Sequence, residues 1–109
     1  VDLVNSHASA QVKGAVLLAG LSAGVSVTVE EPHVSRDHSE RMLQARGVAL
    51  RVSTRDNGAQ VVTLDAAQQV QALDVDVPAD PSSVTFFAAL AALADAGELW
   101  FDNVCLNPT

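Results

Sequence analysis

Two stretches of the chain are apolar on almost every side of a helix, and this pattern limits the possible folds more than any other feature of the sequence. They are "SAQVKGAVLLAGL", residues 9–21, and "PSSVTFFAALAAL", residues 81–93. A helix that packs on one face of a sheet shows one apolar stripe, whereas a helix that is apolar all round is buried on all sides. A chain of 109 residues has little material to cover two such helices, because a domain of this size buries only about two-thirds of its extended surface. We therefore expect uncovered apolar surface, leading to self-association or to binding of a further piece of protein.

Local signals place these helices among strands, in an α+β layout. Ser9 is a suitable N-cap for a helix over residues 10–23, which Gly24 can end. Asp80 caps the later helix, with Pro81 in its first position. Alternating or apolar runs predict strands over residues 1–5, 25–32, 48–55, 59–65, 71–78 and 98–104.

The stretch "DNG" at residues 56–58 predicts a tight hairpin, because Asn57 and Gly58 tolerate the positive φ that such turns need. The resulting order is β-α-β-α-β-β over residues 1–70, followed by β-α-β over residues 71–109. The second part looks like the start of another copy of the first. We expect the two to form one compact domain fragment.

A shorter helix, predicted between the strands over residues 25–32 and 48–55, carries the most informative charges. Ser35 is the N-cap candidate for this helix, which would run to Gly47, with Asp37 in the first turn. Arg36 would also lie in that turn, where a cation opposes the helix dipole by about 0.3–1 kcal/mol. Asp37 or a bound anion can offset this repulsion. Lys13, inside the first helix, is expected to reach solvent.

The remaining polar residues favour structural interpretations. Glu30 and Glu31 are neighbours on a strand and so point to opposite faces, which indicates a polar strand end rather than a catalytic pair. His7, His33 and His38 lack the spacing of metal ligands, and no metal site is expected.

Charge and cysteine usage exclude several classes of partner. The net charge is -7 and only six residues are basic, so nucleic acid and anionic membranes are poor partners. The longest apolar run, residues 86–94, is too short to span a bilayer. Cys105 is the single cysteine, which excludes an internal disulfide and predicts a reducing compartment, the cytoplasm.

Four stretches in collinear order resemble the central part of the 5-enolpyruvylshikimate-3-phosphate (EPSP) synthase family. They are "SAQVKGAVLLAGL" (9–21), "SRDHSERMLQARGV" (35–48), "VPADPSSVTFFAALAAL" (77–93) and "NVCLNPT" (103–109). The triplets "SAQ" and "RDH" are closest to the glyphosate-tolerant branch of that family. The resemblance implies an inside-out α/β barrel built from repeated β-α-β-α-β-β units with their helices packed inside, the enolpyruvyl transferase fold.

The same resemblance implies a reaction and a site. Members of the family transfer the enolpyruvyl group of phosphoenolpyruvate to shikimate 3-phosphate and release phosphate, without a metal or organic cofactor. By resemblance, Ser9 and the backbone at Ala10 hold the 3-phosphate, Gln11 lies against the shikimate ring, and Arg36 neutralises the phosphate. A serine N-cap with free backbone N–H groups suits an anion, and arginine adds a planar fork of donors.

The departures from the family pattern are also informative. The family's catalytic lysine and acid, and the arginines that hold phosphoenolpyruvate, have no counterpart here, and Ala79 replaces a glycine in the "GDPSS" stretch. We therefore expect a fragment that binds shikimate 3-phosphate weakly, contains no catalytic residue and is inactive alone, with phosphoenolpyruvate binding only in a complete enzyme. Two alternatives stay open: a non-catalytic binding module of the same fold, and a purely structural unit that pairs through its apolar helices.

Overall fold

The computed structural model describes residues 1–106 and divides into two compact units, Val1–Leu73 and Asp74–Thr109. We call them the N-terminal unit and the C-terminal unit, and each is described by itself. The boundary between the units lies after Leu73, three residues beyond residue 70, the boundary that the sequence pattern predicts. It stays a prediction that the two parts are repeat units of one compact domain fragment.

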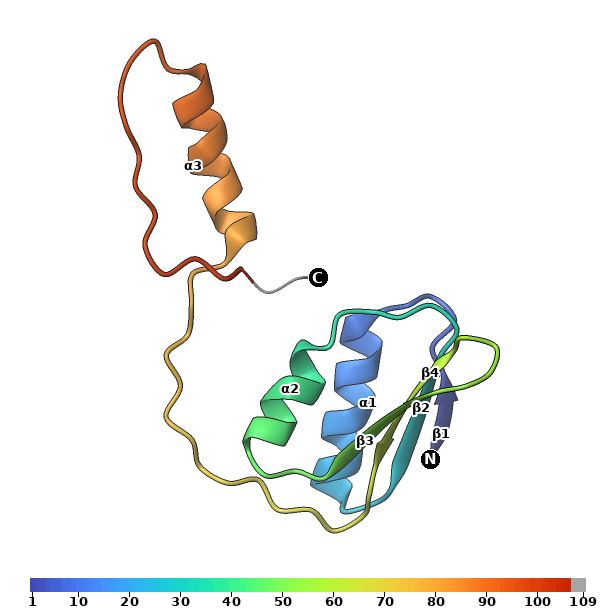
Figure 1. Ribbon diagram of the computed structural model, residues 1–109. Helices are drawn as coiled ribbons and strands as arrows, with labels where there is room; N and C mark the ends of the chain where they lie inside the picture. The colour runs from blue at the N-terminus through green and yellow to red at the C-terminus, as the bar shows by residue number, and fades with distance from the viewer. Residues whose placement is uncertain (107–109) are drawn as a thin grey trace. The chain divides into compact units, whose positions relative to one another are not determined.

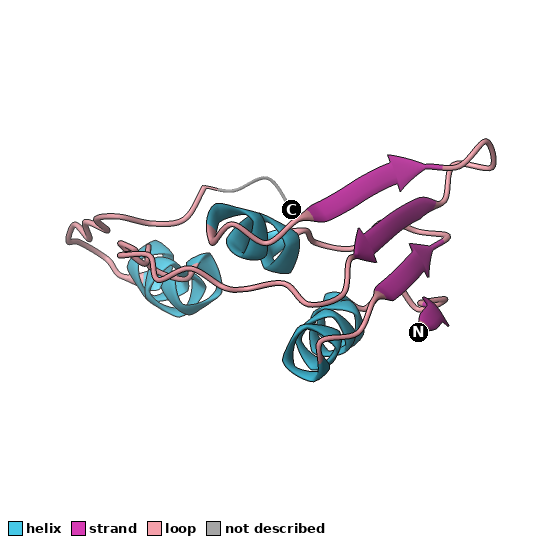
Figure 2. Ribbon diagram, turned by 90° about the horizontal axis from the view of Figure 1, so that it is seen from below, coloured by secondary structure: helices cyan, strands magenta, loops and turns pink. Residues whose placement is uncertain are grey.

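The N-terminal unit is a four-stranded sheet with two helices on one face (Figures 1 and 2). In chain order its elements are β1 (Asp2–Val4), α1 (Ala10–Ala23), β2 (Val27–Glu31), α2 (His38–Ala45), β3 (Leu50–Thr54) and β4 (Gln60–Leu64). The strands lie in the order β1-β2-β4-β3. β1 runs parallel to β2, and the other neighbours are antiparallel. The predicted order of elements in this unit is therefore confirmed.

The core lies between the helices and the inner face of the sheet. Alternate residues of β2 point inward, and they meet the inward residues of β4 in register, as in the pair Val29 and Val62. The buried apolar cluster consists of Leu17, Val27, Val29, Leu43, Val48, Leu50, Val62 and Leu64. α1 packs closely on β2 at Gly20, because a Cβ atom there would collide with the side chain of Val27.

Capping fixes the bounds of α1, as expected. The hydroxyl of Ser9 accepts a hydrogen bond from the Val12 N–H, and Gly24 adopts φ 66° at the C-cap.

The hairpin of β3 and β4 is confirmed as well. Its turn is closed by the Arg55 N–H, which donates to the Ala59 carbonyl at 2.8 Å, and Gly58 has φ 84°.

α2 differs from its prediction. The helix begins at His38 and ends at Ala45, so Ser35 is not its N-cap and Arg36 lies before the helix rather than in its first turn. The Ser35 hydroxyl donates instead to the buried carboxylate of Glu31, at 2.7 Å. Asp37, next to Arg36 in the chain, is the N-cap residue of α2.

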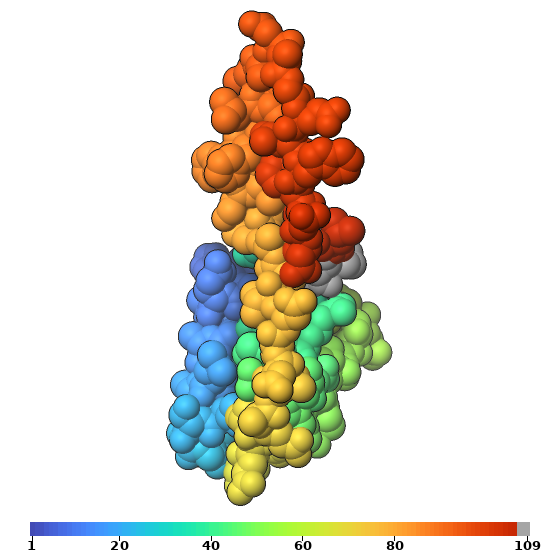
Figure 3. All heavy atoms as spheres, turned by 90° about the vertical axis from the view of Figure 1, so that its left-hand side faces the viewer, coloured from blue at the N-terminus to red at the C-terminus, as the bar shows by residue number. Residues whose placement is uncertain are grey.

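The C-terminal unit contains α3 (Pro81–Leu93), capped by Asp80 as predicted, and a segment that runs back beside it (Figures 1 and 3). The strands predicted over 71–78 and 98–104 are not formed. A single parallel bridge joins Ala79 to Val104. A strand needs a neighbour with which to pair its backbone groups, and here only the first contact of such a pair is present.

The apolar helices are less buried than the sequence pattern predicts. α1 buries one side only, through Lys13, Gly14, Leu17 and Gly20, and none of the residues of α3 is buried. Phe86 is 79% exposed and Leu93 is 85% exposed. The expected uncovered apolar surface is therefore present. Within the described residues no helix is long and apolar enough to cross a membrane.

Candidate functional site

The N-terminus of α1 is held in place from the end of β1. Asn5 is buried, and its side-chain amide donates to the Ser9 carbonyl at 2.9 Å, while its oxygen accepts from the Ser9 N–H at 3.3 Å. The Ser9 hydroxyl accepts from Val12 and donates to the Gln11 side chain, both at 3.3 Å. The N–H groups of Ala10 and Gln11 have no partner inside the helix, as in any first turn. The positive end of α1 therefore points its donors outward.

Arg36 reaches the same region from the segment that joins β2 to α2. A surface hollow of about 470 Å³ is lined by Ala10, Gln11, Gly14, Ala15, Leu18, Arg36, His38 and Ser39. Three of the four predicted site residues thus share one hollow, and Ser9, which does not line it, is the neighbour of one that does. The two helices approach closely here, because a Cβ atom on Gly14 would lie 2.8 Å from the Ser39 hydroxyl.

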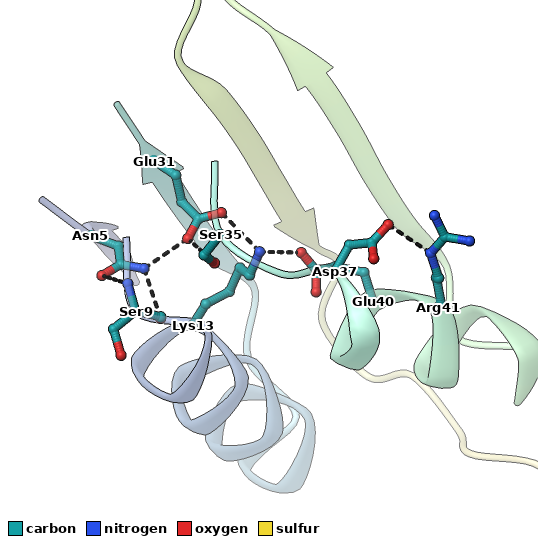
Figure 4. A network of polar contacts seen from close by, with 8 residues as sticks. All are labelled: Asn5, Ser9, Lys13, Glu31, Ser35, Asp37, Glu40 and Arg41. Carbon is teal, nitrogen blue, oxygen red and sulfur yellow. Dashed lines mark hydrogen bonds and ion pairs between the residues drawn. The ribbon is translucent and has the colours of Figure 1, made fainter. Parts of the chain in front are cut away.

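A buried ionic cluster consists of Lys13, Glu31 and Glu40 (Figure 4). Lys13 and Glu40 are the sequence neighbours of Gly14 and Ser39, which line the hollow. The Lys13 ammonium is 2.8 Å from the Glu31 carboxylate and 2.6 Å from that of Glu40. The side chains of Lys13 and Glu31 are 0% exposed and that of Glu40 is 4% exposed. The expectation that Lys13 reaches solvent is therefore wrong.

Two periodic signals in the sequence could have revealed this cluster. Lys13 has the helical spacing of the buried residues Gly14, Leu17 and Gly20. Glu31 has the strand spacing of Val27 and Val29 and so shares their inward face. Glu30 faces the other way, as predicted, and pairs with Arg55 at 2.9 Å.

The charges of the cluster shift two of its pKa values. Burial alone lowers the pKa of Lys13, but the hydrogen bonds and charges of Glu31 and Glu40 outweigh it and leave that pKa raised. Burial alone raises the pKa of Glu31, but Lys13, Ser35 and Asn5 outweigh it and leave that pKa lowered. The ammonium and the Glu31 carboxylate are therefore both charged at neutral pH, in the core of the unit.

The arrangement brings together the parts of an anion site. It offers the N–H groups and the dipole of the start of α1 and the guanidinium of Arg36 around one hollow, and these groups recognise phosphate and carboxylate. Among the described residues no group of three histidine, cysteine or acidic side chains is placed to hold a metal ion. The family stretch at 103–109 falls partly on residues 107–109, which lie outside the described residues.

Comparison with known proteins identifies one family over the whole chain. A profile of the family described as EPSP synthase (3-phosphoshikimate 1-carboxyvinyltransferase) matches residues 1–109. Curated relatives with that enzyme name from Bacillus licheniformis, Aquifex aeolicus and Persephonella marina are 49%, 46% and 43% identical over 109 residues. Each match covers 100% of this chain but only 24%, 25% and 25% of the respective relative. The chain thus spans about a quarter of the length of these relatives.

Solved structures give the same answer for the fold. An EPSP synthase from Acinetobacter baumannii superposes with a TM-score of 0.70 at 37% identity, covering 99% of this chain and 23% of that one. A second structure of an EPSP synthase from the same organism gives a TM-score of 0.71. The predicted α+β architecture of the enolpyruvyl transferases is confirmed. On the sequence match over all 109 residues and on the fold, the chain belongs to the EPSP synthase family.

Proposed function

We propose that this chain is part of an EPSP synthase and contributes one side of its shikimate 3-phosphate site. In the whole enzyme the enolpyruvyl group of phosphoenolpyruvate is transferred to the 5-hydroxyl of shikimate 3-phosphate, and phosphate is released. The observation that carries the proposal is that Ala10, Gln11 and Arg36, from separate parts of the chain, line one hollow.

Each site residue has a role that its place supports. The N–H groups at the start of α1 bind the 3-phosphate, with Ala10 supplying the backbone donor. Arg36, which is exposed and outside the helix, neutralises the phosphate with its planar fork. The 3.3 Å contact from the Ser9 hydroxyl to Gln11 is long, so a phosphate oxygen can replace it. The Gln11 amide then turns toward the shikimate ring.

The remaining chemistry belongs, in this proposal, to the rest of the enzyme. Phosphoenolpyruvate, the group that protonates it and the base for the 5-hydroxyl bind or lie there, and no cofactor takes part. We expect the chain alone to bind shikimate 3-phosphate weakly and to be inactive. The enzyme acts in the cytoplasm, without a nucleic acid or membrane partner.

A second role concerns association through α3. The exposed apolar side chains of this helix include Phe86, Phe87, Leu90 and Leu93. Water-exposed clusters of this kind mark interaction surfaces. We assign this surface to contact with the rest of the enzyme, or with a second copy of the chain when the rest is absent.

The site proposal is tested by titrating the chain with shikimate 3-phosphate and following its amide resonances. We expect shifts at Ser9, Ala10, Gln11 and Arg36, and weaker binding of shikimate, which lacks the phosphate. Arg36→Ala should lower the affinity about tenfold or more, because a hydrogen bond to a charged group contributes roughly 1.5–3 kcal/mol.

Arg51→Ala is the matched control, because it also removes one positive charge. Arg51 lies on strand β3 and pairs with Asp65, and both side chains are exposed. This variant should bind like the parent chain. Shifts confined to other residues, or equal losses in the two variants, would show that the phosphate is bound elsewhere or by net charge alone.

A further inference from the structure

One buried carboxylate, that of Glu31, is hydrogen-bonded both toward the start of α1 and toward the segment that carries Arg36. The Oε1 atom of Glu31 accepts from the Asn5 amide at 2.8 Å and from the Ser35 hydroxyl at 2.7 Å. Its Oε2 atom accepts from the Lys13 ammonium at 2.8 Å. The three donors come from the end of β1, from α1 and from the segment before α2 (Figure 4). Glu31 therefore links three parts of the chain through hydrogen bonds, and the covalent chain alone would not fix the distances between them.

On one side this network leads to the start of α1. The Asn5 nitrogen that donates to Glu31 also donates to the Ser9 carbonyl, at 2.9 Å. The Asn5 oxygen accepts from the Ser9 N–H. Ser9 is thus linked to the carboxylate through a single buried side chain, and it immediately precedes the helix donors that face the hollow.

On the other side the network leads to Arg36. Ser35 is its covalent neighbour, and the hydroxyl of Ser35 is held by Glu31. The Lys13 ammonium adds a second attachment, because it also pairs with Glu40 in the first turn of α2. Both ends of the short segment that carries Arg36 are therefore tied to the buried cluster.

Stability alone is a weak explanation for such a cluster. Moving charges out of water is costly, and replacing buried ion pairs by well-packed apolar residues is often neutral or stabilising. Directed hydrogen bonds to a carboxylate, in contrast, fix distances and angles. The affinity for a phosphate depends on such distances, because all of the donors must reach it at the same time.

We propose that Glu31 is a positioning residue, which sets the spacing between the N-terminus of α1 and the Arg36 guanidinium and thereby the affinity for the phosphate ester. The inference rests on the proposed function, because it concerns the same site. Glu31 touches no ligand in this account and acts only through Asn5, Ser35 and Lys13.

Glu31→Gln is the sharpest variant, because it keeps the shape and leaves Lys13 paired with Glu40. An amide has only one acceptor oxygen. If that oxygen accepts from Lys13, the amide nitrogen faces the donor of Asn5, and the link to Ser9 is broken. Ser35→Ala is the second variant; it removes only the link toward Arg36. Glu30→Gln is the matched control, because it removes the same charge from the adjacent residue on the opposite face.

We expect Glu31→Gln to weaken binding of shikimate 3-phosphate to the 109-residue chain about tenfold, and Ser35→Ala about twofold to tenfold. Glu30→Gln should bind like the parent. The double variant Ser35→Ala/Arg36→Ala should bind no more weakly than Arg36→Ala, because Ser35 acts on binding only through the position of the Arg36 guanidinium. Parent-like binding by both Glu31→Gln and Ser35→Ala, or additive losses in the double variant, would overturn the inference. If Glu31→Gln does not fold, Ser35→Ala decides.

A ligand-free measurement separates this inference from the proposed function. Relaxation of the Ser9 amide, the Arg36 amide and the Arg36 side-chain N–H should change together in Glu31→Gln, and not in Glu30→Gln. If the parent chain binds no phosphate ester, the proposed function fails. The positioning role is then tested only by the relaxation of the Ser9 and Arg36 N–H groups. Unchanged signals at either Ser9 or Arg36 would then refute it.

Discussion

Replacing Lys13 with methionine removes the only cation from the buried cluster while keeping most of the side-chain volume. Both carboxylates would then lie in the core without a counter-charge, since Glu31 is 0% exposed and Glu40 4% exposed. Glu31 would keep its hydrogen bonds from Asn5 and Ser35. The carboxylate oxygens of Glu40, however, have no other hydrogen-bond partner among the described residues.

The expected loss is large relative to the stability of the unit. Removing one partner of a buried ion pair costs about 3–5 kcal/mol. A compact unit of the size of Val1–Leu73 has an unfolding free energy of about 4–11 kcal/mol, at roughly 0.05–0.15 kcal/mol per residue. Lys13→Met should therefore leave the N-terminal unit marginally stable or unfolded at neutral pH.

Urea unfolding followed by amide resonances of β2 and β4 measures this unit alone. Arg51→Met is the control, because the Arg51–Asp65 pair is exposed and such pairs contribute only about 0–1 kcal/mol. The triple variant Lys13→Met/Glu31→Gln/Glu40→Gln, which removes all three charges, should recover much of the loss. A loss below about 1 kcal/mol in Lys13→Met, or an equal loss in Arg51→Met, would refute the reasoning.

Two further predictions concern pH and association. The pKa of Glu31 is lowered on folding, so its stabilisation is complete above its ordinary value of 4.5 and is lost as the pH falls through the folded value. The pKa of Lys13 is raised, so its stabilisation is complete below 10.5 and is lost as the pH rises through the folded value. Urea unfolding across the pH range should show both decreases, with Glu31→Gln flatter at the acid side; a parent-like acid slope in that variant would contradict the assignment. Sedimentation velocity should show a mass that rises with concentration and that Phe86→Ser/Leu93→Ser reduces, because these exposed side chains form the apolar surface of α3; a monodisperse monomer at every concentration would exclude association through it.

Elements with local determinants could be predicted from the sequence, and elements that need distant partners could not. α1 has its cap at Ser9 and its end at Gly24, and the hairpin has its turn at Gly58, so each is encoded within a few residues. The strands expected over 71–78 and 98–104 have suitable alternation but form only the bridge from Ala79 to Val104. Alternation describes which side chains share a face, and it does not supply the neighbouring strand.

The buried ionic cluster cannot be predicted from the local pattern of the sequence, for a different reason. On its own helix Lys13 is one charge in an apolar stretch, where reaching solvent is the ordinary behaviour of a lysine. Its burial follows only when the inward position of Glu31 on β2 and that of Glu40 on α2 are considered together. The burial of Lys13 depends on ion pairs that join α1, β2 and α2, and the sequence of any one of these elements does not predict it.

The position of Arg36 follows from the same competition between local and distant partners. As an N-cap, Ser35 would stabilise α2 by about 1 kcal/mol. As a donor to the buried carboxylate of Glu31 it forms a hydrogen bond to a charged group, which contributes about 1.5–3 kcal/mol. The distant partner is the stronger one, so α2 begins later, at His38. Arg36 is thereby left outside the helix, among the residues that line the hollow in which we propose that the 3-phosphate binds.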